Sequence, residues 1–210
     1  MEMSNDFCEN KSICIVGPAN LEKNMSELID SHDIVVRMNN YKNVTSSYYG
    51  TKRTIYIGSY LFGSEIDNDF EIYLCIAEST FQRFSKMKKY LNCNDNVAFV
   101  DITTNLKNAN IYNKKYCPTN GLIALYIFLS MIESITQLSI VGMSFGLTSY
   151  NEQYNNTKID YFNDIVSNGK HSYKEDCETF AEMFHNLNDQ NKGKIFIENT
   201  KLKQFVMVYK

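Results

Sequence analysis

The sequence predicts an α/β domain in which a mostly parallel sheet carries helices on both faces. Short apolar, β-rich runs alternate along the chain with segments whose apolar residues recur at helical spacing, and this alternation is typical of parallel sheets. The strand-like runs are apolar, as expected for strands that helices cover on both sides. With 210 residues, of which 44% are hydrophobic and 21% charged, the chain fits one domain, 1–210, with a sizeable core.

Seven runs are predicted as strands, and these are 12–17, 34–38, 53–59, 71–77, 96–101, 137–145 and 194–198. Helices are predicted over 20–33, 79–91 and 118–135, and from Ser172 onward. Residues 1–11 are expected to be flexible, a polar loop with several tyrosines spans about 146–169, and a short tail follows the last strand. Parallel sheets of this kind bind ligands beyond the carboxyl ends of their strands, at the point where the strand order reverses.

Charge and cysteine content exclude several classes of function. The net charge of −3 lacks the basic excess of a nucleic-acid-binding protein. None of the six cysteines forms a C-x-x-C pair, which argues against a zinc cluster. The amino terminus is polar and acidic, and the longest apolar stretch, 121–132, is too short to span a bilayer. We therefore expect a cytoplasmic protein with reduced thiols, and peripheral membrane contact stays open.

The first candidate site follows the first strand. Gly17 ends this strand and opens a tight loop, where glycine allows the backbone to approach a ligand closely. Asn20 is a candidate N-cap for the next helix, whose start favours negative charge, and Asn39 follows the second strand. The alternative is a plain βαβ unit with capping residues. No G-x-G-x-x-G occurs here, so dinucleotide binding has no support.

The second candidate is the start of the apolar helix after Pro118. Thr119 or Asn120 can cap this helix, and Gly121 opens it. The helix is apolar nearly all round and is therefore expected to be buried. A buried helix start with hydroxyl, amide and backbone N–H groups suits a carboxylate or a phosphate. The alternative is simple capping.

The third candidate surrounds the start of the helix at Ser172. Ser172 and Glu175 match the S-x-x-E capping box. His171 precedes the cap and Asp176 is the fourth residue of the helix, so the two side chains are expected to be neighbours. The carboxylate could orient the imidazole and stabilise its charged form, whereas the helix start favours the neutral form. The alternative is that His171 is an ordinary surface residue.

A fourth candidate, the D-x-D at 67–69, is a pattern that can hold a divalent metal on a nucleotide-sugar diphosphate. The pattern is common in acidic loops, and nothing near it supports a metal. We therefore expect neither a metal nor another cofactor.

Taken together, these segments resemble the sialyltransferases. The run 12–40, with "IDSHD" and "RMN", looks like the large sialyl motif of glycosyltransferase family 29, and "GTKRT" at 50–54 is similar to the sequence that follows it. The run 118–143 resembles the small motif, and "HSYKED" at 171–176 the very small motif. The histidine segment is also similar to the H-S-x-x-x-D of family 42. The resemblance covers about Ser12–Thr54 and Cys117–Glu178.

The sequence departs from the family-29 pattern at several points. Pro18 stands where the first asparagine of the loop would be, and Asn120 replaces a hydroxyl residue. The cysteine pair that links the large and small motifs in secretory-pathway members is missing, which agrees with a reducing compartment. The third motif is at best "DYFND" at 160–164 and lacks its histidine.

The resemblance implies a sialyltransferase-like variant of a Rossmann-like fold and an inverting transfer from a CMP-linked nonulosonic acid, such as CMP-sialic acid, to a glycan hydroxyl. Two alternatives stay open: a CMP-Kdo-type transferase, and a non-catalytic nucleotide-binding domain of the same fold. A homo-oligomer or a membrane surface could complete the acceptor site. The implied catalytic residues are His171 as the base, Asp176 beside it, and Tyr150 and Tyr161 at the departing phosphate; the implied donor-binding residues are Gly17, Asn20, Asn39, Thr119, Asn120 and Gly121.

Overall fold

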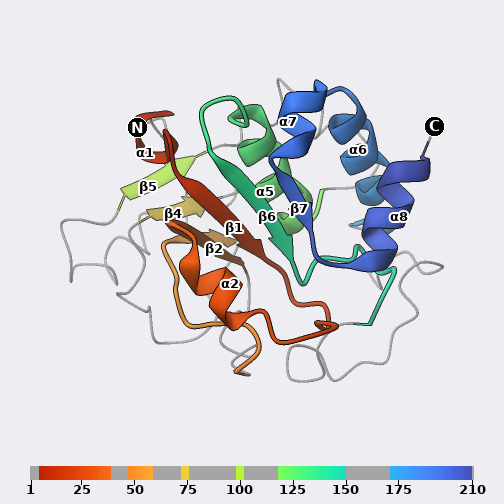
Figure 1. Cartoon of the computed structure of the whole chain (residues 1–210), viewed down its shortest axis with the longest axis horizontal. Helices are drawn as coiled ribbons and strands as arrows, with labels where there is room; N and C mark the ends of the chain where they lie inside the picture. The colour runs from red at the N-terminus through yellow and green to blue at the C-terminus, as the bar shows by residue number, and fades with distance from the viewer. Residues whose placement is uncertain are drawn as a thin grey trace.

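We describe a computed structural model of the chain, over residues 5–38, 47–58, 72–75, 98–101, 118–149 and 171–209. Within these ranges, seven strands form one sheet in which each strand is parallel to its neighbours (Figure 1). Each strand falls inside a run predicted from the sequence, so the predicted fold class is confirmed. The strands are β1 (Ser12–Val16), β2 (Ile34–Met38), β3 (Ile55–Gly58), β4 (Ile72–Cys75), β5 (Ala98–Asp101), β6 (Gln137–Val141) and β7 (Ile195–Ile197).

The strand order fixes where a ligand site can form. It runs β5-β4-β3-β2-β1-β6-β7, so the chain builds outward from β1 to one edge and then returns to the other side of β1. The order therefore reverses between β1 and β6, which pair in register from Ser12 with Gln137 to Val16 with Val141. The loops that open with Gly17 and Gly142 leave the carboxyl ends of these two strands, where parallel sheets bind their ligands.

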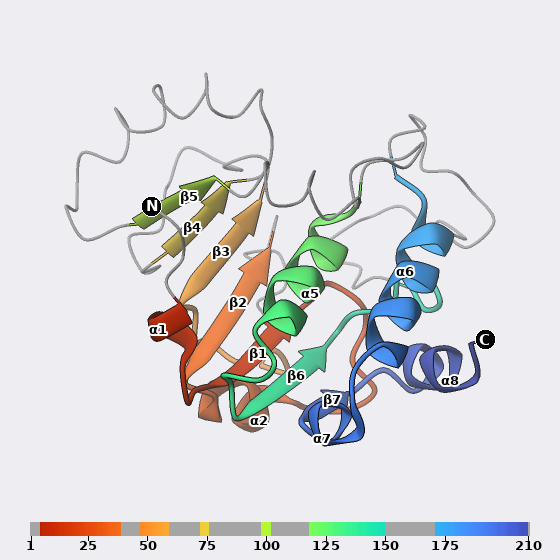
Figure 2. The same ribbon diagram turned by 90° about the horizontal axis from the view of Figure 1, so that it is seen from above.

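Helices cover both faces of the sheet (Figures 1 and 2). Apolar side chains of α2 meet Cys14, Val35 and Val141 on one face. The larger core lies on the other face, where α5 and α6 pack on β1, β2, β3 and β6. The described helices are α1 (Asn5–Cys8), α2 (Ser26–Ser31), α5 (Asn120–Ser130), α6 (Tyr173–His185), α7 (Asp189–Gly193) and α8 (Thr200–Val208).

The structure corrects three expectations about local structure. The helix expected over 20–33 is confined to α2, and its N-cap position is Met25 rather than Asn20. Upstream, the Asn24 side chain accepts the N–H and the hydroxyl of Ser26 and so forms a turn. The expected tail is helix α8, which the side chain of Asn199 caps.

The amino-terminal segment contains a short helix that begins at Asn5. α1 lies inside the segment expected to be flexible, and Cys8 at its end is fully buried. The helix predicted over 79–91 and most of the loop predicted over 146–169 lie outside the described residues.

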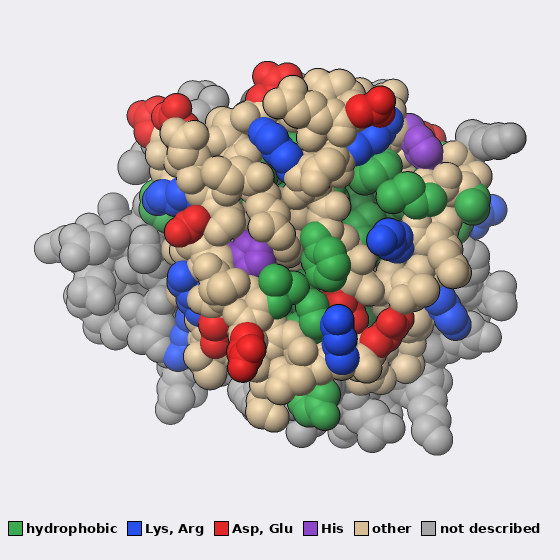
Figure 3. All heavy atoms as spheres, in the orientation of Figure 1, with side chains coloured by type: hydrophobic (Ala, Val, Ile, Leu, Met, Phe, Trp, Pro, Cys, Tyr) green, Lys and Arg blue, Asp and Glu red, His purple; other side chains and the backbone are tan. Residues whose placement is uncertain are grey.

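None of the described helices is long and apolar enough to cross a bilayer. On the face in Figure 3, acidic and basic side chains of the described residues are interspersed.

Candidate functional site

The start of α5 is built by Thr119. Its backbone is extended (φ −71°, ψ 160°) and its hydroxyl accepts the N–H of Leu122 at 3.3 Å, so Thr119 is the N-cap and Asn120 is the first helical residue. Gly121 is buried, and a Cβ at this position would lie 2.8 Å from Cε of Met143. The glycine therefore lets the first turn of α5 pack against the loop that follows β6.

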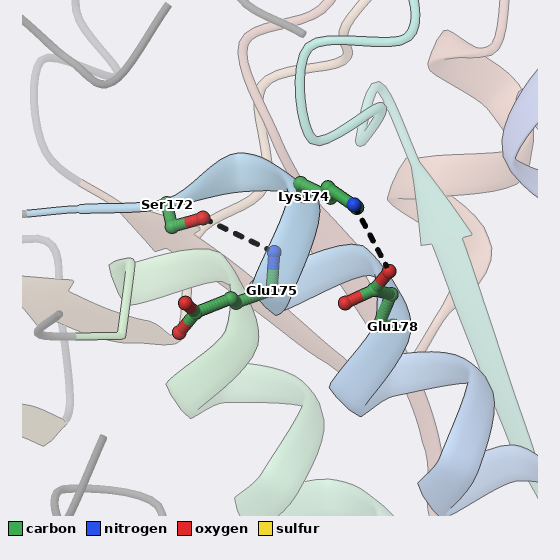
Figure 4. Close-up of polar contacts among 4 residues, drawn as sticks. All are labelled: Ser172, Lys174, Glu175 and Glu178. Carbon is green, nitrogen blue, oxygen red and sulfur yellow. Dashed lines mark hydrogen bonds and ion pairs between the residues drawn. The ribbon is translucent and has the colours of Figure 1, made fainter. Parts of the chain in front are cut away.

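The start of α6 is built by Ser172. Its hydroxyl accepts the N–H of Glu175 at 3.3 Å, and Figure 4 shows this contact. This is the bond from the cap serine that the predicted capping box requires. One turn further, Lys174 pairs with Glu178 at 3.9 Å on the solvent side. His171, which is half-buried, immediately precedes the cap.

Asp176 joins the two helix starts. Its side chain is 4% exposed, and its Oδ2 accepts the backbone N–H of Thr119 at 2.9 Å. The two segments are 57 residues apart in the sequence and lie side by side at the same end of the sheet (Figure 2). The structure therefore brings Asp176, and with it the start of α6 that His171 precedes, to the start of α5 at Thr119.

Cys177 follows Asp176 but lies on the core side of α6. It is fully buried among apolar side chains. Burial, together with the charges of Glu178 and Asp176, raises the pKa of its thiol to about 12. The thiol therefore stays protonated at neutral pH, and because only the thiolate is a good nucleophile, Cys177 serves packing.

Gly17 and Gly142 bring two loops into contact at the point where the strand order reverses. The N–H of Gly17 donates to the carbonyl of Val141 at 2.8 Å, and the N–H of Ala19 donates to that of Gly142 at 2.7 Å. A Cβ on Gly17 would overlap the Gly142 carbonyl and lie 2.5 Å from Cγ of Met143. The close approach that the sequence predicts at Gly17 is thus made by another loop of the protein.

Asn20 strengthens the same contact between loops. Its N–H donates to the carbonyl of Ser149, and its Nδ2 donates to the Ser149 hydroxyl, both at 3.1 Å. Asn20 is exposed. Its side chain therefore lies on the rim between the loop after β1 and the loop after β6.

Glu198 is a residue that the sequence analysis missed. It follows β7, is 9% exposed, and accepts the N–H of Glu22 at 3.2 Å and the N–H of Gly142 at 3.3 Å. The next residue, Asn199, donates to the hydroxyl of Thr148 at 3.1 Å. A carboxylate directly after a strand beside the reversal point was the available signal, but its partners lie far away in the sequence.

Polar side chains of the run 12–54 form hydrogen bonds with other segments of the protein. Asp30 accepts the N–H groups of Thr51 and Lys52 at 2.8 to 2.9 Å. Burial acts to raise the pKa of Asp30, but these bonds and the charge of Arg37 outweigh it and lower the pKa. Gly50 has a positive φ of +63°, and a Cβ there would overlap the Asp30 carboxylate.

Three further polar residues of the run 12–54 also bond to other groups of the protein. His32 is buried, with Nδ1 2.7 Å from the carbonyl of Leu28 and Nε2 2.8 Å from the hydroxyl of Ser139. Asp33 accepts the N–H and the hydroxyl of Ser12, both at 2.8 Å, and these bonds lower its pKa. Arg37 donates from Nη2 to the carbonyl of Lys52 at 2.9 Å.

Several predicted site residues lie outside the described ranges, and these are Tyr150, Tyr161, Asn39 and the D-x-D at 67–69. Among the described residues, no group of three or more His, Cys, Asp or Glu side chains is placed to hold a metal ion.

The fold matches solved sialyltransferase structures. CstII from Campylobacter jejuni, in complex with the substrate analogue CMP-3FNeuAc, superposes with a TM-score of 0.56 at 16% identity over 93% of this chain and 84% of that one. A mammalian sialyltransferase in complex with Gal-beta-1-3GalNAc-ortho-nitrophenol gives 0.56 at 13% identity over 93% and 71%. No protein-family model and no curated protein matches the sequence. The chain therefore shares its fold with the sialyltransferases.

Proposed function

We propose that this chain is an inverting glycosyltransferase that moves sialic acid, or a related nonulosonic acid, from a CMP-linked donor to a hydroxyl of a glycan. The observation that carries this proposal is the bond from the Thr119 N–H to Asp176. It joins the segments that resemble the small and very small sialyl motifs at one end of the sheet. The shared fold of sialyltransferases solved with CMP and with CMP-3FNeuAc supports the same conclusion.

His171 is the proposed catalytic base. An acceptor hydroxyl is a poor nucleophile at neutral pH, so its proton must be removed as it attacks the anomeric carbon, and such assistance is worth roughly 10²–10⁴-fold. In the proposed step the new C–O bond forms, the bond to the CMP phosphate breaks, and the proton goes to the imidazole. A single displacement of this kind inverts the configuration of the anomeric carbon.

The start of α5 is the proposed site for the donor's phosphate or carboxylate. Asn120 and Gly121 present backbone N–H groups at the positive end of the helix dipole there, and Thr119 adds its hydroxyl, since its own N–H donates to Asp176. The loops at Gly17 and Gly142 offer fewer donors to a phosphate, because the N–H groups of Gly17, Ala19 and Gly142 already donate to Val141, Gly142 and Glu198.

The remaining predicted residues take complementary roles in the proposal. Gly17, Asn20 and Asn39 line the nucleoside end of the donor, and Tyr150 and Tyr161 donate hydrogen bonds to the phosphate as it departs. CMP leaves with a single phosphate, so we propose that transfer requires no metal ion.

The test is a transfer assay with purified protein, CMP-sialic acid, CMP-Kdo and a panel of glycan acceptors, with EDTA present, and with products detected by mass spectrometry. We expect transfer from CMP-sialic acid. The variant His171→Ala should bind CMP as the wild type does while its turnover falls about 100-fold or more. His185→Ala is the matched control, because His185 lies at the other end of α6 and contacts the carbonyl of Val206 at 2.7 Å.

Three outcomes would overturn parts of the proposal. Binding of CMP without transfer from any donor would favour a non-catalytic nucleotide-binding domain. Transfer from CMP-Kdo alone would replace the proposed donor. Equal turnover of wild type and His171→Ala would remove His171 from the mechanism.

A further inference from the structure

Asp176 connects the start of α6, which directly follows the proposed base, to the proposed phosphate site at the start of α5. We infer that it is a positioning residue which acts through Thr119: its carboxylate fixes the first turn of α5 against α6 and so sets the spacing between the donor phosphate and His171. This inference rests on the proposed function for its catalytic consequence. The bond itself belongs to the fold and can be tested without any activity.

The position of Asp176 makes it an effective link. Its carboxylate is 4% exposed and lies 2.9 Å from the Thr119 nitrogen, and buried hydrogen bonds are costly to break because the groups left behind are unsatisfied. Cys177, the next residue, is fully buried in the core. The start of α6 therefore cannot shift without disturbing that core. The bond from Thr119 to Asp176 thus holds the start of α5 in place relative to α6.

Two hydrogen bonds of Thr119 hold the first turn of α5: the bond to Asp176 and the helix cap. Thr119 donates its backbone N–H to Asp176 and accepts the Leu122 N–H on its hydroxyl. The same residue thus serves both α6 and α5. Loss of the carboxylate would leave the Thr119 N–H without that acceptor and free the turn that carries Asn120 and Gly121 to move. A displacement of about 1 Å in such a site can cost about 100-fold in rate.

Two substitutions separate positioning from a charge effect on the imidazole. Asp176→Asn keeps an oxygen that can accept the Thr119 N–H but removes the negative charge, whereas Asp176→Ala removes both. Positioning through Thr119 predicts that kcat/KM falls about 100-fold in Asp176→Ala and no more than about fivefold in Asp176→Asn. The pH profile of kcat/KM should keep its shape in Asp176→Asn. Equal losses in the two variants, with a displaced pH profile, would overturn the inference and make Asp176 a charged partner of His171.

Thr119 offers a second route to the same test. Its φ of −71° suits proline, so Thr119→Pro removes the N–H donor together with the hydroxyl cap, whereas Thr119→Ala removes only the hydroxyl cap. We expect Thr119→Pro to lose more kcat/KM than Thr119→Ala, and the combination of Thr119→Pro with Asp176→Ala to lose little beyond the larger single effect. Fully additive losses would show that the two residues do not act together.

Amide hydrogen exchange distinguishes failure of this inference from failure of the proposed function. Protection of the Thr119 amide should be retained in Asp176→Asn and lost in Asp176→Ala, whether or not the protein transfers any sugar. Unchanged protection in Asp176→Ala would overturn the inference. A wild type without transfer activity, but with this exchange pattern, would overturn only the proposed function.

Discussion

Two regions of the chain resemble the sialyltransferase motifs, and they use their polar side chains differently. In the run 12–54, Asp30, His32 and Arg37 bond to backbone or side chains of neighbouring elements. At the starts of α5 and α6, Thr119 and Ser172 cap the two helices and Asp176 joins them, and the cap of α6 directly follows His171 in the chain. The pattern "IDSHD" thus belongs to the scaffold, whereas the starts of α5 and α6 carry the candidate chemistry.

This difference has a physical basis. A buried polar group must find a partner or else reduce stability, so a motif that joins α2, β2 and the turn at Gly50 constrains almost every one of its polar residues. A reacting group must leave room for substrate, so fewer of its neighbours are fixed by the fold. Substitutions in the scaffold should therefore act mainly on stability, whereas substitutions at the starts of α5 and α6 should also act on transfer activity.

Gly17→Ala should reduce the free energy of unfolding by about 3 kcal/mol or more, because its methyl group would overlap the Gly142 carbonyl and Met143. Urea denaturation followed by circular dichroism measures this. Gly193→Ala is the control: nothing lies within 4 Å of a Cβ there, and its effect should stay within about 1 kcal/mol. A Gly17→Ala protein as stable as the wild type would contradict this packing role of Gly17.

Glu198→Gln should reduce stability by about 2 kcal/mol, because a glutamine has one oxygen for the two N–H groups of Glu22 and Gly142 and presents an NH₂ group to the other. Chemical denaturation measures the change. The exposed Glu133 offers the control, since Glu133→Gln should be within about 0.5 kcal/mol of wild type. An unchanged stability of Glu198→Gln would show that the carboxylate does not hold the two loops together.

Thr119→Ala should reduce stability by about 1 kcal/mol through loss of a helix cap, and it should also lower transfer activity. Asn188→Ala removes an equivalent cap, the bond from the Asn191 N–H at 2.8 Å at the start of α7, and should cost a similar amount of stability with transfer unchanged. Thermal unfolding and the transfer assay give both quantities. If both variants keep full activity, the start of α5 is part of the scaffold as well.

Asp30→Asn should show a small, pH-dependent effect. The pKa of Asp30 lies below its ordinary value of 3.8 in the folded protein, so the charged carboxylate stabilises the fold above about pH 4 and this contribution is lost as the pH falls through the folded pKa. At pH 7 the wild type should have the larger free energy of unfolding, and the difference from Asp30→Asn should become smaller below pH 3.8. Denaturation at several pH values measures it, with the exposed Asp189→Asn as control. A difference that stays constant with pH would contradict this role.

Much of the fold could be predicted from the sequence because strands buried on both faces must be apolar throughout. All seven predicted strands occur, and β2 and β3 are buried at every position. α8 was missed because it is a short segment with two lysines in its first turn, and only Leu202 and Val206 of its residues are buried. α2 is shorter than predicted because Asn24 forms a turn with Ser26, which a periodic pattern of apolar residues does not reveal.

The sequence by itself determined the parallel sheet, a helix cap at Thr119 or Asn120, the cap at Ser172, and the candidacy of His171, because each depends on residues that are neighbours along the chain. Only the tertiary structure decided that Asp176 holds the Thr119 N–H, that Gly17 packs on Gly142, and that Glu198 joins two loops. These contacts join segments whose proximity follows from the strand order β5-β4-β3-β2-β1-β6-β7, and no local pattern encodes which buried donor meets which acceptor.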